Sequence, residues 1–199
     1  MCFFKQYRVK QLTKKILKLK MARLDNAASA HAIQKEIKFY HKLYHLYQKL
    51  EGHKAFPFAR EQSLMMLRFA SQLDDAKAQY FLGQALLEEA KWRDQLEKNQ
   101  VFSHVENKQL IQPLYDTART ILTKAAVRQS LAKRLLGTIY VFGFGVAANQ
   151  DKGLALIMES IVEEKSWKKM PRILKSLGLD KPEFYTALLK QKDLSLEQG

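Results

Sequence analysis

The chain has 199 residues, 47% of them hydrophobic and 11% aromatic, which is enough for a buried core and too apolar for a disordered tail. Lys and Arg outnumber Asp and Glu by 34 to 20, a net charge of +14, and the single cysteine excludes an internal disulfide framework or a multi-cysteine zinc site. No apolar run of about 18 residues or signal-peptide pattern is present, so we expect cytoplasmic residence, or delivery by a secretion system that needs no signal peptide.

The basic charge is concentrated at the N-terminus. Residues 1–24 contain eight Lys and Arg and no acid, which leaves +6 of the net charge for residues 25–199. Within this segment Leu12, Ile16 and Leu19 recur at helical spacing, and this predicts a basic, loosely amphipathic helix over 3–24. Its expected basic surface consists of Lys10, Lys14, Lys15 and Lys18.

The rest of the chain predicts an all-α fold. Only eight glycines and four prolines interrupt it, and the regions between them are rich in good helix formers. Gly52, Asp74-Asp75 and Gly178 have the residue types that end or cap helices. The expected helices are 28–50, 58–73, 76–96, 113–127, 131–142, 150–164, 171–177 and 183–192. Pro113 is expected to start its helix, after a polar, non-helical segment over 98–112.

Two of the predicted helices share a sequence pattern. Aligning "AKAQYFLGQALL" (76–87) with "SLAKRLLGTIYV" (130–141) superposes an Ala, a Leu and a mid-helix Gly in each. A glycine inside a helix costs about 1 kcal/mol relative to alanine. We therefore expect Gly83 and Gly137 to allow a neighbouring helix to approach closely.

A second glycine pattern lies in "LGTIYVFGFGVAANQDKGLALI" (136–157). A phosphate-binding loop needs a β-strand before its glycines and a helix directly after them. Here a predicted helix precedes Gly143, and Val146 follows Gly145 within a non-helical stretch. The pattern therefore predicts a turn between two helices, with left-handed backbone angles at both glycines.

These residues resemble the Sel-one-like repeats, a family related to the tetratricopeptide arrays. The matching positions are Ala132, Leu136, Gly137, Tyr140, Gly143, Gly145, Val146 and Lys152, with Asn149 in place of an Asp and Gly153 in place of an Ala. The resemblance covers about residues 60–165. An upstream unit lacks the Gly-x-Gly-Val turn and carries about twenty extra residues between Leu87 and Pro113.

The resemblance implies an α-solenoid, a right-handed superhelix of antiparallel helix pairs. Repeat-like units are expected at about 28–73, 76–126 and 131–165, followed by a C-terminal cap over 167–192. The corresponding domains are the basic helix 1–24 and a single repeat domain 25–199.

The implied function is a non-enzymatic adaptor or scaffold for protein partners, of the kind found in bacterial secretion and host interaction. No cofactor, metal or small-molecule substrate is expected. Expected partner contacts are the non-consensus, concave-side residues Lys77, Phe81, Gln84, Lys133, Arg134 and Thr138. The 88–112 insertion adds Trp92 and Phe102, because aromatic residues outside the repeat pattern suit interface hot spots.

Two patterns that resemble chemical sites have simpler interpretations. His41 and His45 have the spacing of a helical zinc pair, but a lysine follows His41 and no third ligand lies nearby, so we predict packed or solvated histidines. The tyrosines of "FYHKLYHLYQ" (39–48) can stack on nucleic-acid bases, but their helical spacing favours packing. No arrangement for nucleophilic catalysis is present.

Several interpretations of the helix 3–24 stay open. It can cover the first apolar face of the solenoid, or pair with an acidic partner helix. It can also bind nucleic-acid phosphates. On an anionic membrane, the inserting side chains would be Phe3, Phe4, Tyr7, Leu12 and Ile16.

Overall fold

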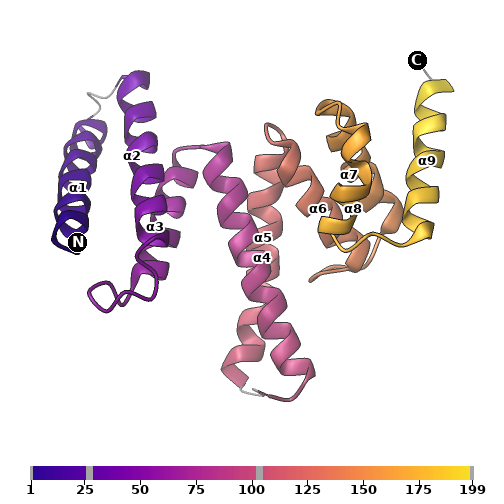
Figure 1. The fold of residues 1–199 in the computed structure, drawn as a ribbon, viewed down its shortest axis with the longest axis horizontal. Helices are drawn as coiled ribbons and strands as arrows, with labels where there is room; N and C mark the ends of the chain where they lie inside the picture. Colours follow the sequence, from indigo (N-terminus) through magenta and orange to yellow (C-terminus); the bar gives the residue numbers. More distant parts are fainter. Residues whose placement is uncertain (1, 26–28, 102–104, 198–199) are drawn as a thin grey trace. The chain divides into compact units, whose positions relative to one another are not determined.

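The structure is a computed structural model that describes residues 2–25, 29–101 and 105–197. Within these ranges the regular structure is entirely helical, as Figure 1 shows, and successive helices pack in antiparallel pairs. The elements are α1 (Cys2–Leu24), α2 (Ala30–Gln48), α3 (Ala59–Gln72), α4 (Ala76–Lys98), α5 (Val105–Ala126), α6 (Ser130–Phe142), α7 (Gln150–Glu163), a 3₁₀ turn (Trp167–Lys169), α8 (Met170–Ser176) and α9 (Pro182–Glu197). The predicted all-α fold is confirmed.

Side-chain caps begin three of these helices, and the starts of α4 and α7 are those that the sequence predicts. The Ser29 hydroxyl accepts a hydrogen bond from the Ala32 amide at 3.3 Å, and an Asp75 oxygen accepts one from Ala78 at 2.7 Å. Asn149 does the same for Lys152 at 2.9 Å. These bonds satisfy amide groups that have no partner inside the helix, so each helix starts at a defined residue.

Packing divides the chain into two compact units, Met1–Leu82 and Gly83–Gly199. In the first unit α2 packs against both α1 and α3. Its core includes Leu50 and Leu67, both at most 1% exposed, and the aromatic side of α2. The sequence-based domains 1–24 and 25–199 stay a prediction, because a division by packing does not test which part folds alone.

In the second unit, α5 packs on α6, α6 on α7, and α7 on α9. Buried residues from α6 to α9 form one apolar core around Ile157, Ile161, Leu174 and Leu188, all fully buried. This core ties the C-terminal helices α8 and α9 to the repeat-like pair α6 and α7.

The mid-helix glycines lie where helices cross closely, as the sequence predicts. A Cβ added to Gly137 would lie 2.6 Å from the Ile157 side chain and 2.7 Å from the Gly153 carbonyl oxygen of α7. A Cβ on Gly83 would meet Leu122 of α5 at 2.6 Å. Both contacts are shorter than real Cβ contacts, so a side chain at either position would force the facing groups to shift.

The Gly-Phe-Gly segment forms the predicted turn between α6 and α7. Gly143 and Gly145 have φ angles of +68° and +66°, in the left-handed region that favours glycine. Between them the Phe144 ring stacks on Tyr115 of α5, with centroids 6.1 Å apart and an interplanar angle of 7°. The turn therefore packs against the preceding helix.

The insertion differs from the sequence-based expectation. The helix α4 ends at Lys98, close to its predicted end at 96, but residues 105–112 extend α5, so Pro113 lies inside a helix and does not start one. The Gln112 side chain donates a hydrogen bond to the Gly145 carbonyl at 2.8 Å, and Tyr115 donates one to Asp94 at 3.3 Å. These two hydrogen bonds anchor α5 on either side of Pro113, so the helix continues past the proline. The helix α9 also runs past the predicted end at 192.

Candidate functional site

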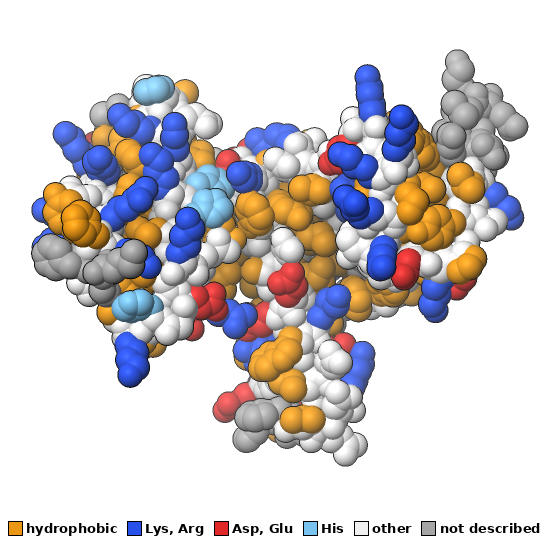
Figure 2. Space-filling model, viewed as in Figure 1, with side chains coloured by type: hydrophobic (Ala, Val, Ile, Leu, Met, Phe, Trp, Pro, Cys, Tyr) orange, Lys and Arg blue, Asp and Glu red, His pale blue; other side chains and the backbone are white. Residues whose placement is uncertain are grey.

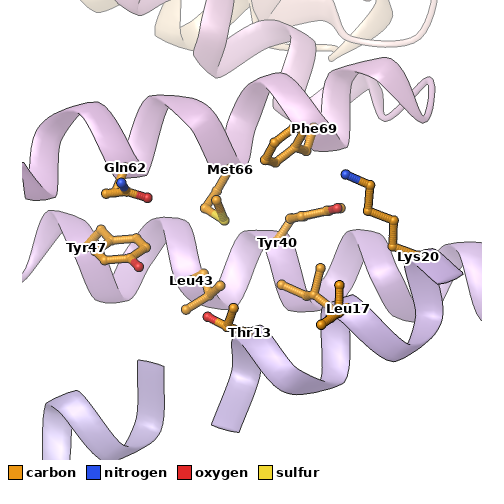
Figure 3. A pocket seen from close by; sticks show the side chains of 10 residues that line it. Thr13, Leu17, Lys20, Tyr40, Leu43, Tyr47, Gln62, Met66 and Phe69 are labelled. Carbon is orange, nitrogen blue, oxygen red and sulfur yellow. The ribbon is translucent and has the colours of Figure 1, made fainter. Parts of the chain in front are cut away.

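A groove in the first unit is a candidate site formed by described residues. It lies between α1, α2 and α3, has a volume of about 180 Å³ and opens to solvent (Figure 3). The lining residues are Thr13, Ile16, Leu17, Lys20, Tyr40, Leu43, Tyr47, Gln62, Met66 and Phe69. Most of these side chains are apolar or aromatic, as in sites that bind an apolar group.

The helix α2 forms the floor of the groove, and α1 and α3 form its two walls. Tyr40, Leu43 and Tyr47 of the floor are buried, with 3%, 2% and 9% of their surfaces exposed. In Figure 3, Leu17 lies on the α1 side of this floor and Phe69 on the α3 side. The residues i, i+3 and i+7 of α2 share one helix face, which explains why these three side chains line up along the groove.

A partly buried ion pair joins the floor to the α1 wall. Glu36 of α2 is 1% exposed, and its carboxylate accepts hydrogen bonds from Arg23 at 3.1 Å and from the Tyr40 hydroxyl at 3.0 Å. Burial and the bond to Glu36 raise the pKa of Tyr40, which keeps the hydroxyl protonated as a donor. The groove is therefore built on a side-chain network whose charges are satisfied.

One cation lies at the edge of the groove. The Lys20 ammonium of α1 lies 5.2 Å from the centre of the Phe69 ring of α3, a cation–π distance. Figure 3 shows this side chain reaching from α1 toward Phe69 at one end of the groove. Lys20 therefore connects the two walls and gives that end positive charge.

Exposed apolar residues continue the α1 wall beyond the cavity. Leu17, Met21 and Leu24 follow at i, i+4 and i+7 and are 58%, 51% and 61% exposed. Phe58, which directly precedes α3, and Met65 of α3 are 67% and 42% exposed. Large apolar side chains left in solvent at this spacing are typical of a surface that packs against another helix.

The predicted contacts at the start of α4 are partly packed. The Lys77 ammonium lies 6.0 Å from the centre of the Phe81 ring, and Phe81 contacts Tyr44 at a centroid distance of 5.8 Å. The Gln84 side chain donates a hydrogen bond to Glu88 at 3.1 Å. As partner-binding residues, all three stay a prediction.

The predicted contacts on α6 have internal partners. Lys133 forms ion pairs with Glu159, at 2.8 Å, and with Glu163 of α7. Burial would lower the pKa of Lys133, but the bonds and charges of these two carboxylates outweigh it and raise the pKa. These bonds join α6 to α7, so releasing Lys133 to a partner has a cost.

Arg134 and Thr138 are also held within the unit. Arg134 donates a hydrogen bond to the buried Ser160 hydroxyl at 2.8 Å and forms an ion pair with Glu164. Thr138 is 5% exposed, and its hydroxyl donates to the Leu135 carbonyl at 2.7 Å. Their role in partner binding stays a prediction.

Of the two aromatic residues predicted as partner contacts in the 88–112 insertion, the structure describes one. Trp92 of α4 is 60% exposed, and Val101, Val105 and Leu110 near the ends of α4 and α5 are 65%, 72% and 47% exposed. Phe102 lies outside the described residues. The hairpin thus presents apolar surface, while Arg93 holds its two helices together through a 2.9 Å hydrogen bond to Asn107.

The predicted basic surface of α1 is exposed at Lys10, Lys14, Lys15 and Lys18. Two side chains of the predicted membrane-inserting set are placed differently, because Leu12 and Ile16 are only 9% and 7% exposed. Both lie on the inward side of a helix that packs on α2.

The two histidines of α2 have different partners. His41 Nε2 lies 2.7 Å from an Asp75 oxygen, and His45 Nδ1 lies 3.2 Å from the Gln48 side-chain oxygen. In the described ranges, no group of three or more potential His, Cys, Asp or Glu ligands surrounds a possible metal position.

Sequence analysis did not identify the groove. The spacing of Leu17, Met21 and Leu24 was a visible signal, but Leu12 and Ile16 gave an equally regular stripe on the same helix. Deciding which stripe is buried requires knowing how α1 packs on α2.

Comparisons with known proteins leave the family of the chain open. No family model matches it, and no curated protein matches it. A crystal structure of a protective antigen of uropathogenic Escherichia coli, which displays an SLR (Sel-one-like repeat) fold, matches with 20% identity and a TM-score of 0.25. The match covers 92% of this chain and 48% of that one, so the chain spans about half its length. A TM-score of 0.25 is too low to assign a fold, so the all-α fold is established from the helices of this chain alone. No helix in the described part is long and apolar enough to cross a membrane.

Proposed function

We propose that the chain is a non-enzymatic helical scaffold that binds an amphipathic helix of a partner protein in the groove between α1 and α3. The observation that carries this proposal is the open, apolar groove itself, whose α2 floor is buried and whose α1 wall continues into the exposed Leu17, Met21 and Leu24. Helices dock into such grooves through apolar side chains spaced three and four residues apart.

The electrostatics favour an acidic partner helix. The first unit, residues 1–82, contains 16 Lys and Arg and six Asp and Glu, a net charge of +10. Lys20 lies at one end of the groove. The buried Glu36 of α2, the floor helix, is neutralised by its ion pair with Arg23. Acidic side chains flanking the apolar face of the partner would gain from this field, mainly in association rate.

Of the sequence-based alternatives for residues 1–24, an anionic membrane is less well supported, and nucleic-acid binding by this segment stays a prediction. Leu12 and Ile16 pack on α2 and are unavailable for insertion. The exposed Phe4 and Tyr7 lie on the same helix as Lys10 and Lys14, so a membrane-surface contact of the N-terminal end stays a second proposal. The compartment, and an association with bacterial secretion or host contact, likewise stay predictions.

The test compares a groove variant with a matched variant elsewhere. Full-length wild type, Leu17→Glu and Val162→Glu serve as baits in nuclease-treated lysate of the source cells, and each retained protein is then titrated in purified form. Leu17 lines the groove at 58% exposure, and Val162 of α7 is 49% exposed, so both variants should fold.

We expect Leu17→Glu to weaken partner binding at least tenfold, because it places a charge in an apolar contact, and Val162→Glu to change it less than twofold. Equal affinity of the partner for wild type and Leu17→Glu would contradict binding in the groove.

A further inference from the structure

A continuous row of basic side chains lies along α2 on its outer face. The α2 basic row consists of His31, Lys35, Lys38, Lys42, His45 and Lys49, and all six side chains are exposed. The steps between them alternate between four and three residues, which places them on one side of a helix. At 1.5 Å per residue the row is about 27 Å long. Figure 2 shows Lys and Arg side chains gathered over α1 and α2.

The opposite face of α2 is packed. Tyr40, Tyr44 and Tyr47 are 3%, 8% and 9% exposed, and two of them form the floor of the groove. The helix therefore has one face that supports the fold and another that carries charge. The charged face makes no contribution to the packed core, so the core does not explain why its basic residues are regularly spaced.

The charge of the row is not neutralised by nearby acids. The acidic residues within 29–51 are Glu36, which is 1% exposed and bonded to Arg23 and Tyr40, and Glu51, which is exposed just past the last lysine of the row. Within the described chain, the four lysines of the row form no ion pair with a carboxylate.

The neighbouring elements reinforce the row. Lys15 of α1 and Lys42 lie 5.8 Å and 5.5 Å from the centre of the same Phe39 ring, which brings a cation of α1 beside the row. On the other side, the Asp75 carboxylate that reaches α2 is bonded to His41 and to the Ala78 amide. That acid is therefore already used within the unit.

We propose that the α2 basic row binds the phosphate backbone of a double-stranded nucleic acid. A straight row of lysine ammonium groups is complementary to a regular line of phosphates, and lysine binds phosphate as a compact point charge. A duplex carries one negative charge per about 1.7 Å of its axis, so several phosphates face a row of this length. Four lysines and Lys15 then make four or five phosphate contacts.

The chemistry of the row separates this ligand from other polyanions. Phe39, the apolar side chain beside Lys42, is half-buried, whereas a helix that lies in a membrane surface needs exposed apolar side chains beside its cations. Single-stranded nucleic acid is bound by exposed aromatic rings, and the tyrosines of α2 are buried. The lysines can contact phosphates without reading bases, so we expect little sequence preference.

This site is independent of the groove. The groove lies over the packed face of α2, and the row lies on the opposite side, so each can be altered separately. A failure of the row to bind a duplex leaves the proposed partner helix untouched, and the reverse also holds.

The test measures binding of the full-length, nuclease-treated protein to a fluorescent 24-base-pair DNA duplex of arbitrary sequence, across a range of salt concentrations. The row variant carries Lys→Gln at positions 35, 38, 42 and 49. The control variant carries Lys→Gln at positions 165, 168, 175 and 190. These lysines are also exposed, and their substitution removes the same charge as in the row variant. Circular dichroism checks that both variants remain folded.

For wild type, four phosphate contacts predict that log K falls against log salt with a slope of about −3.6. The row variant should bind at least tenfold more weakly at about 0.05 M salt, because each phosphate contact contributes up to about eightfold in affinity at 0.1 M salt. It should also lose most of the dependence of log K on log salt. The control variant should bind within threefold of wild type. A second duplex of unrelated sequence should bind equally well.

Equal binding by the row and control variants, or no duplex binding at about 0.05 M salt, would overturn the proposal. So would tighter, row-dependent binding of polyglutamate or of vesicles that contain anionic lipid, since these would identify an acidic protein or a membrane as the ligand. A larger loss on Lys→Gln at positions 10, 14 and 18 than at the row would place the contact on α1 and also overturn it.

Discussion

At the residue scale, the α6–α7 crossing depends on two facing glycines. A Cβ on Gly137 would lie 2.7 Å from the Gly153 carbonyl oxygen, and one on Gly153 would lie 2.6 Å from the Gly137 carbonyl oxygen. Backbone atoms cannot rotate away as a side chain does, so the helices would have to separate.

We therefore predict that Gly137→Ala destabilises the fold by about 1–3 kcal/mol, although alanine is the better helix former by about 1 kcal/mol. Chemical denaturation measures the change. Gly153→Ala should act in the same direction, and the double variant should cost less than the sum, because one separation of the two helices relieves both clashes. A stabilising effect of Gly137→Ala would show that the helices do not cross so closely.

Tyr115 provides a prediction of pH dependence. Its burial, together with the charge of Asp94 and the hydrogen bond to it, raises the pKa of the hydroxyl to about 12. Because the pKa is higher in the folded state, the protonated hydroxyl of Tyr115 stabilises the fold. This stabilisation is fully present below the pKa of tyrosine in the unfolded chain, near 10, and is lost as the pH rises toward 12.

Wild type should therefore lose up to about 2–3 kcal/mol more stability between pH 10 and pH 12 than Tyr115→Phe, because the variant has no hydroxyl to ionise. Urea unfolding of both proteins at pH 8, 10 and 12 gives the difference. Parallel pH profiles would contradict the described environment of Tyr115.

At the element scale, most helix boundaries could be predicted because they depend on local chemistry. Asp75, Asn149 and Gly143 act at the ends of helices through their own side chain or backbone angle, and the sequence shows such residues directly. The sequence pattern also identified the buried Leu-Gly positions, because the crossing partner was implied by the cost of a mid-helix glycine.

Pro113 could not be predicted in the same way. A local rule places proline at the first turn of a helix, and the polar segment before it supported that position. The α4–α5 hairpin overrides this preference through contacts from distant residues, including the bonds of Gln112 to Gly145 and of Tyr115 to Asp94. The groove was missed for the same reason, since it exists only when α1 and α3 flank α2.

We predict that Pro113→Ala stabilises the protein by about 1–3 kcal/mol, because it restores a backbone donor inside a continuous α5 and relieves the proline clash. Pro113 is exposed, so little packing is lost. Thermal unfolding of the variant and of an exposed control in the same helix, Thr120→Ala, measures this effect. No gain in stability would indicate that α5 begins at Pro113.

At the scale of the whole molecule, the charge is distributed unequally between the two compact units. Residues 1–82 hold +10 of the net charge of +14, whereas residues 83–199 hold 18 Lys and Arg and 14 Asp and Glu. In the second unit several of these cations, including Lys133 and Arg134, join α6 to α7. In the first unit most cations face solvent beside the groove and the α2 basic row, so binding functions are expected to concentrate there.

The most direct test of partner binding in the groove is photo-crosslinking in the source cells. A photoreactive amino acid replaces Leu17 in one protein and Val162 in another, and the crosslinked products are identified by mass spectrometry. We predict that position 17 yields a discrete protein crosslinked through an amphipathic helix, and that position 162 does not. Crosslinks that are absent at position 17, or are the same at both positions, would contradict the groove as the binding site.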